Sequence, residues 1–151
     1  MNNEIGERLM EILLVDDNPG DLRLAAEALK EVNVQARLHT AKDGMEAMAF
    51  LRRRGKYVNA PRPDLILLDL NMPRMNGRQV LAEIKEDSVL KHIPVVVLTG
   101  SRELDDMVKT YDLHANSYVT KPADFEQFIV MLNSITSFWL SVLGYQWRGV
   151  N

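Results

Sequence analysis

Five polar residues each follow an apolar run, at points where buried strands should end. Asp16 and Asp17 follow the first run, Asp69 the third, Thr99 the fourth and Lys121 the fifth. Because the carboxyl ends of parallel strands lie side by side, we expect these side chains to converge. Three carboxylates at close range need a counter-charge, and an oxygen-only ligand set of this kind suits Mg²⁺. Lys121 supplies a point charge that suits a phosphate oxygen.

Such a site predicts phosphoryl chemistry at Asp69. With a metal ion and two hydrogen-bond donors around it, this carboxylate could attack phosphorus and form an acyl phosphate. Taken singly, each residue has a simpler interpretation: Asp17 as part of a capped helix start, Asp69 as the start of a turn, Thr99 as a helix cap and Lys121 as a surface lysine. Their joint occurrence, each at the end of the correct strand, favours the functional interpretation.

The elements that must position these residues are visible as alternating patterns. Continuous apolar runs and short β-type segments predict strands at 12–15, 36–40, 64–68, 94–98 and 116–119. Helical spacing predicts helices at 19–31, 45–51, 78–86, 103–111 and from 123 onward. This alternation suits right-handed βαβ crossovers. It predicts an α/β fold, a doubly wound (βα)5 five-stranded parallel sheet of flavodoxin-like type in a three-layer αβα sandwich.

The motifs resemble a response-regulator receiver domain of two-component signalling. They are D-D after the first strand, D-L-N-M-P-R-M-N-G at the third, T-G-S at the fourth and K-P at the fifth. The resemblance covers about residues 9–135. Residues 1–8 are then a flexible N-terminal tail, and residues 136–151 extend the last helix and form a C-terminal tail, an interaction or dimerisation element.

The resemblance implies a role for each matching residue. Asp69 is the phosphoacceptor, Asp16, Asp17, Asp69 and Asn71 hold Mg²⁺, Lys121 binds the phosphoryl group, and Thr99 and Tyr118 form the switch. The phosphoryl group comes from a phosphohistidine on a histidine kinase, and the domain then changes conformation to signal through protein contacts. The Lys121–Pro122 bond is expected to be cis.

Two further features narrow the resemblance. The loop at 55–63 and the aromatic tail after Ile135 look like single-domain regulators paired with bacterial phytochrome kinases. Residues 136–151 are too few for a DNA-binding output domain, so we expect the protein to act on other proteins, with a downstream phosphotransfer protein as one candidate partner.

Two other classes of protein share parts of this pattern. An Mg²⁺-dependent aspartyl-phosphate phosphatase of the haloacid-dehalogenase type carries D-x-D, but position 71 is Asn, so the proton donor for turnover is missing. A flavodoxin-like cofactor binder needs a phosphate cradle after the first strand, where Asp16 and Asp17 would repel a phosphate. We therefore expect no enzyme activity beyond self-phosphotransfer and slow autodephosphorylation.

The last helix carries more apolar surface than one face can bury. Phe125, Phe128 and Trp139 lie on one stripe and Phe138 lies outside it, and these four residues are the predicted interface. A homodimer is the leading hypothesis, and folding of the extension back onto the domain is the alternative.

Composition sets the remaining expectations. The 151 residues carry a net charge of −3, which gives no electrostatic footprint for nucleic acid. Cysteine is absent and the N-terminus lacks the order of a signal peptide. No uninterrupted apolar run reaches the ~20 residues that span a bilayer. A cytoplasmic domain without membrane contact is expected.

Overall fold

The computed structural model describes residues 9–70, 72, 75–100 and 117–149. Its strands are β1 (Met10–Val15), β2 (Ala36–Ala41), β3 (Leu65–Asp69), β4 (Val95–Thr99) and β5 (Ser117–Thr120). Its α-helices are α2 (Pro19–Leu29), α3 (Gly44–Leu51), α4 (Gly77–Glu86) and α6 (Phe125–Gly149), with short 3₁₀ helices η1 (Gly55–Tyr57) and η2 (Leu90–His92).

The strands form one parallel sheet in the order β2-β1-β3-β4-β5. From β1 the chain goes to β2 on one side of the sheet, and it then returns to β3 on the other side of β1. The direction in which strands are added to the sheet therefore reverses between β1 and β3. At such a reversal the connecting segments leave a crevice at the carboxyl ends of the two strands, which is where doubly wound sheets bind ligands. The register pairs Val15 with Leu68, and the residues that follow them therefore lie at the crevice.

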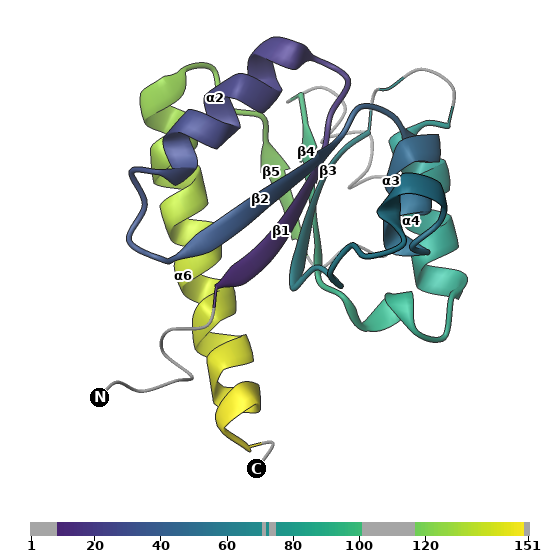
Figure 1. Cartoon of the computed structure of the whole chain (residues 1–151). Coiled ribbons are helices and arrows are strands. Elements are labelled where there is room, and N and C mark those ends of the chain that lie inside the picture. Colours follow the sequence, from purple (N-terminus) through teal and green to yellow (C-terminus); the bar gives the residue numbers. More distant parts are fainter. Residues whose placement is uncertain (1–8, 71, 73–74, 101–116, 150–151) are drawn as a thin grey trace.

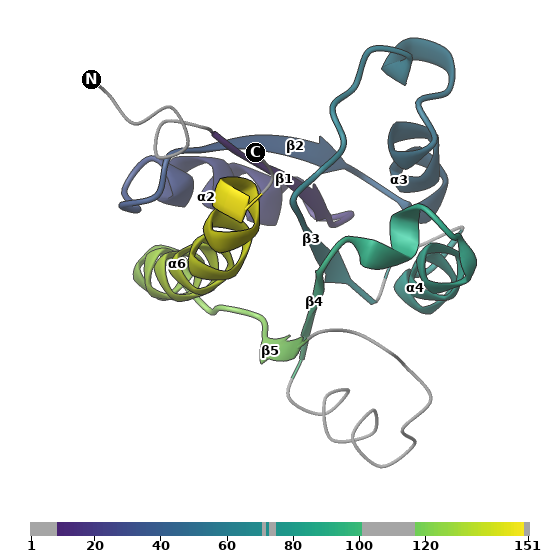
Figure 2. The ribbon, with the colours of Figure 1, turned by 90° about the horizontal axis from the view of Figure 1, so that it is seen from below.

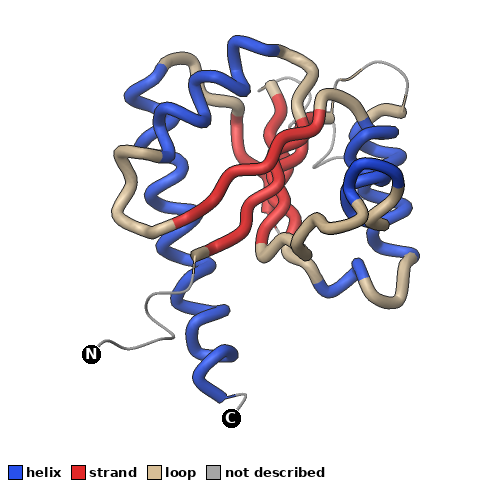
Figure 3. Tube along the Cα trace, viewed as in Figure 1, coloured by secondary structure: helices blue, strands red, loops and turns tan. Residues whose placement is uncertain are grey.

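Helices cover both faces of the sheet (Figures 1 and 2), with α2 and α6 on one face and α3 and α4 on the other. Figure 3 shows the strands enclosed between these two helical layers. All residues of β3 are buried, as expected of a strand covered on both faces. One apolar cluster lies on the α3–α4 side and a second on the α2–α6 side, so both faces of the sheet are packed.

The predicted fold class is confirmed. The five predicted strands are present, and strand ends differ from the predicted bounds by only one or two residues. The predicted helix at 103–111 lies outside the described residues. The loop at 55–63 contains the turn η1, and α6 continues without a break through residue 135, so the predicted extension is part of the last helix.

Candidate functional site

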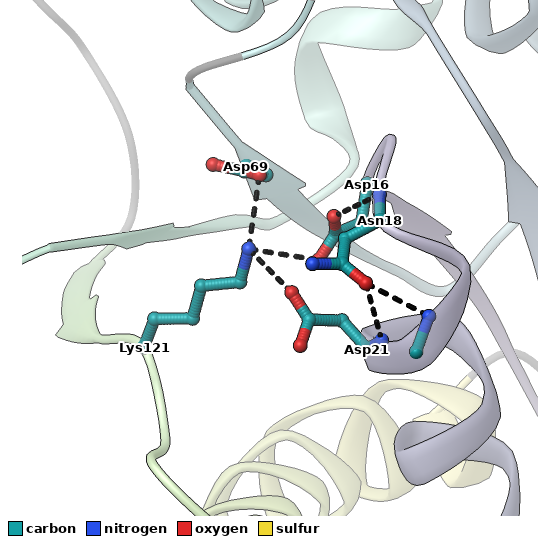
Figure 4. Close-up of polar contacts among 6 residues, drawn as sticks. Asp16, Asn18, Asp21, Asp69 and Lys121 are labelled. Atoms are coloured by element: carbon teal, nitrogen blue, oxygen red, sulfur yellow. Dashed lines mark hydrogen bonds and ion pairs between the residues drawn. The ribbon is translucent and has the colours of Figure 1, made fainter.

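Three predicted site residues meet at the carboxyl end of the sheet (Figure 4). Asp16 directly follows β1, Asp69 is the last residue of β3, and Lys121 directly follows β5. The Lys121 Nζ lies 3.1 Å from Asp69 Oδ2 and 3.1 Å from Asp16 Oδ2. The predicted convergence of these groups is therefore observed.

The Asp16 side chain is buried. Its residue surface is only 1% exposed, and its Oδ1 accepts a hydrogen bond from Asn18 N at 2.9 Å. The other oxygen, Oδ2, lies near the Lys121 ammonium but receives no hydrogen bond of acceptable geometry from the described residues. Burial raises the pKa of Asp16 from 3.8 to about 6, although the Asn18 N–H and the Lys121 charge act in the opposite direction.

Lys121 contacts a third carboxylate that the sequence did not indicate. Its Nζ lies 2.7 Å from Asp21 Oδ2, closer than to Asp16 or Asp69. Burial by itself lowers the pKa of Lys121, but the hydrogen bond with Asp21 and the charges of Asp69 and Asp16 outweigh burial and raise it. Burial therefore dominates for Asp16, whereas ion pairing dominates for Lys121, and the lysine stays charged in the site.

The loop between β1 and α2 fixes the position of these acids. Asn18 caps α2 by accepting hydrogen bonds from Gly20 N at 2.8 Å and Asp21 N at 3.2 Å, and Pro19 opens the helix. The first turn of α2 thus points at the site and carries Asp21 into it. A carboxylate in the first turn of a helix, four residues after Asp17, was the only sequence signal for this residue.

The acidic residues also fit a divalent cation. Asp16, Asp17 and Asp69 each offer an oxygen, and these three atoms all lie within 4.8 Å of one another. Asp17 is exposed and the other two are buried, so the group opens to solvent on one side. Together with the unsatisfied Asp16 oxygen, this hard, oxygen-only donor set fits a metal ion that retains water ligands.

The turn after β3 packs directly against the backbone of Asp69. Gly77 N donates to Leu70 O at 3.0 Å, and a Cβ at Gly77 would lie 2.4 Å from Asp69 O and 2.5 Å from Leu70 Cα. Asn76 begins α4 with a capping box that includes Gln79. The start of α4 at Gly77 therefore packs against the backbone of Asp69 and restricts its position.

Replacing Gly77 with Ala should destabilise the protein by about 1–3 kcal/mol, because the new methyl group meets backbone atoms that cannot rotate away. Gly144→Ala is the matched control, since no atom lies within 4 Å of its Cβ position inside α6. That control should be neutral or gain up to about 1 kcal/mol. Urea unfolding measures both, and equal effects of the two substitutions would contradict the role given to Gly77.

Other predicted site residues are only partly described. Asn71 lies outside the described residues. Thr99 ends β4 beside Thr120 of β5, as predicted, and its side chain is not described. Tyr118 is half-buried in β5 and packs against the α3–α4 side of the core. The Lys121–Pro122 bond is trans, the isomer that X-Pro bonds favour by about 0.5–1 kcal/mol, so the cis expectation is wrong.

The predicted interface residues do not share one surface. Phe128 is 1% exposed and packs in the α2–α6 core, so its assignment to an interface is corrected: it has no surface left to offer a partner. Trp139 is half-buried against the same core. Phe125 and Phe138 are exposed, and the Phe138 ring meets Trp139 edge to face at 5.0 Å.

The segment Phe125–Gly144 is long and apolar enough to cross a membrane by length and composition alone. The segment meets this criterion through its average composition, because scattered Ser, Thr and Asn residues interrupt the apolar run without making the helix polar. Only 28% of this segment is buried. Its buried residues include Phe128, Leu132 and Thr136, which pack the helix against the domain. Length and composition are weak evidence for a span, and core helices meet the same criterion.

A cavity of about 790 Å³ lies between α3 and α4, lined by Met45, Met75, Gln79, Ala82 and Glu83. None of these residues belongs to the cluster of carboxylates around Lys121. The groups capable of chemistry are therefore at the strand ends and not in this cavity.

The comparison with known families agrees with this geometry. The sequence matches the response regulator receiver domain over residues 12–133. The chain belongs to this family. As a receiver domain it is a two-component response regulator, and the match falls within the predicted bounds of 9–135.

Individual relatives of the receiver domain are similar over nearly their whole length. Response regulator Rcp1 of Synechocystis sp. is 50% identical over 132 residues, covering 87% of this chain and 90% of Rcp1. The phosphorylated cyanobacterial phytochrome response regulator RcpA is 53% identical, with a TM-score of 0.80, over 89% of this chain and 96% of RcpA. The Mn²⁺-bound form of Rcp1 has a TM-score of 0.76 at 50% identity, over 87% and 94% of the two chains. The resemblance to phytochrome regulators is confirmed.

Proposed function

We propose that Asp69 is the phosphoacceptor of this response regulator. The observation that best supports this proposal is the position of the Lys121 ammonium group, 3.1 Å from the Asp69 carboxylate. Asp16 and Asp21 also lie next to this ammonium group, at the edge of the sheet where the strand order reverses. One Asp69 oxygen attacks the phosphorus of a phosphohistidine, the P–N bond breaks, and its electron pair remains on the imidazole nitrogen. The product is an acyl phosphate on Asp69, and Lys121 stays beside the transferred oxygens.

Asp16, Asp17 and Asp69 would hold Mg²⁺, with the backbone carbonyl of Asn71 as the further ligand that the family resemblance implies. When bound, Mg²⁺ offsets the negative charge that develops on the phosphoryl oxygens. The donor set consists of carboxylate oxygens, which suits Mg²⁺ and Mn²⁺ alike, and the related Rcp1 is known in an Mn²⁺-bound form.

The phosphodonor in this proposal is a histidine kinase of the phytochrome type. Support comes from the similarity to RcpA, which is a cyanobacterial phytochrome response regulator. The domain then acts as a two-state switch. The phosphoryl group recruits Thr99, and Tyr118 changes its packing, so that a partner protein reads the altered surface of β5 and α6. The protein has no turnover activity beyond its own phosphotransfer and slow dephosphorylation.

Phosphoramidate provides a direct test, because its P–N bond is of the same kind as that in phosphohistidine. The purified protein should gain the mass of one phosphoryl group in the presence of Mg²⁺, and EDTA should prevent the gain. Labelling that is insensitive to EDTA would contradict a metal-dependent transfer.

The same proposal includes a homodimer formed through the exposed apolar side chains of α6. Phe138 is 58% exposed and Val130 65%, so α6 presents large apolar side chains to the solvent. The second surface that α6 needs would come from a second copy of the chain.

Phe138→Ser should shift the protein from dimer to monomer at micromolar concentration, since it removes an exposed aromatic side chain that is not one of the buried core residues. Val89→Ser is the matched control, because Val89 is 62% exposed but lies next to η2, far along the chain from α6. Sedimentation velocity reports both variants. A wild-type protein that is monomeric before and after phosphorylation would refute the dimer.

A further inference from the structure

Asp21 makes the shortest of the three contacts that Lys121 forms with carboxylates. The Nζ–Oδ2 distance is 2.7 Å, against 3.1 Å to both Asp16 and Asp69 (Figure 4). An ammonium group has three donors, and here it faces three carboxylates. A phosphoryl oxygen that reaches Lys121 therefore competes with these carboxylates for the ammonium group.

The three carboxylates differ in what else they must do. Asp16 and Asp69 belong to the group of acids whose oxygens lie within 4.8 Å of one another, and Asp69 is also the proposed phosphoacceptor. Among the described residues, Asp21 is not part of that group. A metal ion would draw on the first two carboxylates, whereas the Asp21 contact can persist through metal binding and phosphorylation.

The local structure keeps Asp21 available for this contact. Its side chain is 21% exposed, compared with 1% for Asp16 and 5% for Asp69, so it lies toward the mouth of the site. It occupies the first turn of α2, where the Asn18 cap fixes its backbone and the helix dipole favours a negative charge. Asp21 thus stands on the solvent side of Lys121, opposite the buried acids.

We propose that Asp21 is a positioning residue, which holds the Lys121 ammonium over Asp69 while the other two carboxylates change partners. This inference rests on the proposed phosphotransfer. In the unmodified protein Lys121 bridges all three acids. During transfer it exchanges the Asp69 oxygen for a phosphoryl oxygen and keeps Asp21. Without Asp21, the third donor of Lys121 turns to water, and the ammonium is less often in place when the phosphoryl group arrives.

The test is a double-mutant cycle on the rate of labelling by phosphoramidate in Mg²⁺. Asp21→Asn keeps the size and removes the charge, and should slow labelling about tenfold, within the range that contacting residues show. In a Lys121→Gln background the same substitution should have little further effect. Asp21→Glu should recover most of the wild-type rate, because it restores a carboxylate in the first turn of α2.

Glu27→Gln is the matched control. It removes the same charge from the same helix, but its partner is the exposed Lys30 at 3.3 Å and not Lys121. It should label at the wild-type rate. Thermal unfolding of each variant, with and without Mg²⁺, checks that the fold is retained.

Three results would overturn the inference about Asp21. Asp21→Asn could label at the wild-type rate, its effect could be equally large in the Lys121→Gln background, or Asp21→Glu could be as slow as Asp21→Asn. Any of these with a normally labelled wild-type protein leaves the proposed function standing. A wild-type protein that phosphoramidate does not label in Mg²⁺ removes the proposed function and this inference together.

Discussion

With Asp16 replaced by Asn, the EDTA-treated protein should become more stable at pH 8 and bind Mg²⁺ at least tenfold more weakly. The stability gain arises because Asp16 is buried and its pKa is raised from 3.8 to about 6, mainly by burial. A carboxyl whose pKa is higher in the folded state than in the unfolded chain favours folding when protonated. Its ionisation therefore costs the folded protein about 3 kcal/mol once the pH exceeds 6.

The sign of this effect predicts its pH dependence. The protonated Asp16 contributes its full stability to the wild-type protein below pH 4, and this contribution is lost as the pH rises through about 6. Asp16→Asn cannot ionise, so its advantage of about 2–3 kcal/mol should appear at pH 8 and vanish near pH 4. Added Mg²⁺ should narrow the gap at pH 8, since it stabilises only the protein that binds it well.

Asp17→Asn provides the control for this prediction. Asp17 belongs to the same acidic group but is exposed, so its replacement should weaken Mg²⁺ binding with little change in stability without metal. Urea unfolding at pH 4 and pH 8, with EDTA or with Mg²⁺, measures all three proteins. An Asp16→Asn protein less stable than wild type at pH 8 in EDTA would show that the buried charge does not carry this cost.

A cluster of this kind trades stability for binding. Asp16 is buried next to Asp69, a second acid, and one of its oxygens has no hydrogen bond from the described residues. A sequence optimised for stability alone would not bury such a pair. The arrangement is favourable once a cation or a phosphoryl group is counted as part of the site, which is why the cluster indicates function.

The strand ends were predictable from the sequence for a simple reason. Buried strands such as β3 read as unbroken apolar runs, so the polar residue that ends each run is placed in three dimensions by the sheet alone. Asp16, Asp69 and Lys121 follow this rule and lie together. Asp21 was missed because its position depends on the direction of the first turn of α2, which no periodicity encodes.

The last helix shows a second limit of sequence patterns. Apolar spacing identifies the faces of α6, but it does not tell which face the chain itself covers. Phe128 was therefore assigned to an interface although the core buries it, while Phe138 on another face is exposed. Whether a surface of α6 meets a second copy depends on chain–chain association, which hydrophobic periodicity within one chain does not specify.

Asp69→Asn should abolish phosphorylation while preserving the fold. Asparagine matches aspartate in size and keeps an oxygen, but its amide is a far weaker nucleophile than a carboxylate and does not form an acyl phosphate. The buried position of Asp69, 3.1 Å from Lys121, tolerates the neutral side chain because Asp16 and Asp21 remain as partners of the lysine. The loss of labelling should therefore not reflect unfolding, which thermal melting can confirm.

The most direct measurement is intact-mass spectrometry of wild type and Asp69→Asn after incubation with phosphoramidate and Mg²⁺. The wild-type protein should gain one phosphoryl group that hydroxylamine removes, as an acyl phosphate requires, and Asp69→Asn should gain none. Stoichiometric labelling of Asp69→Asn would contradict the assignment of Asp69 as the phosphoacceptor.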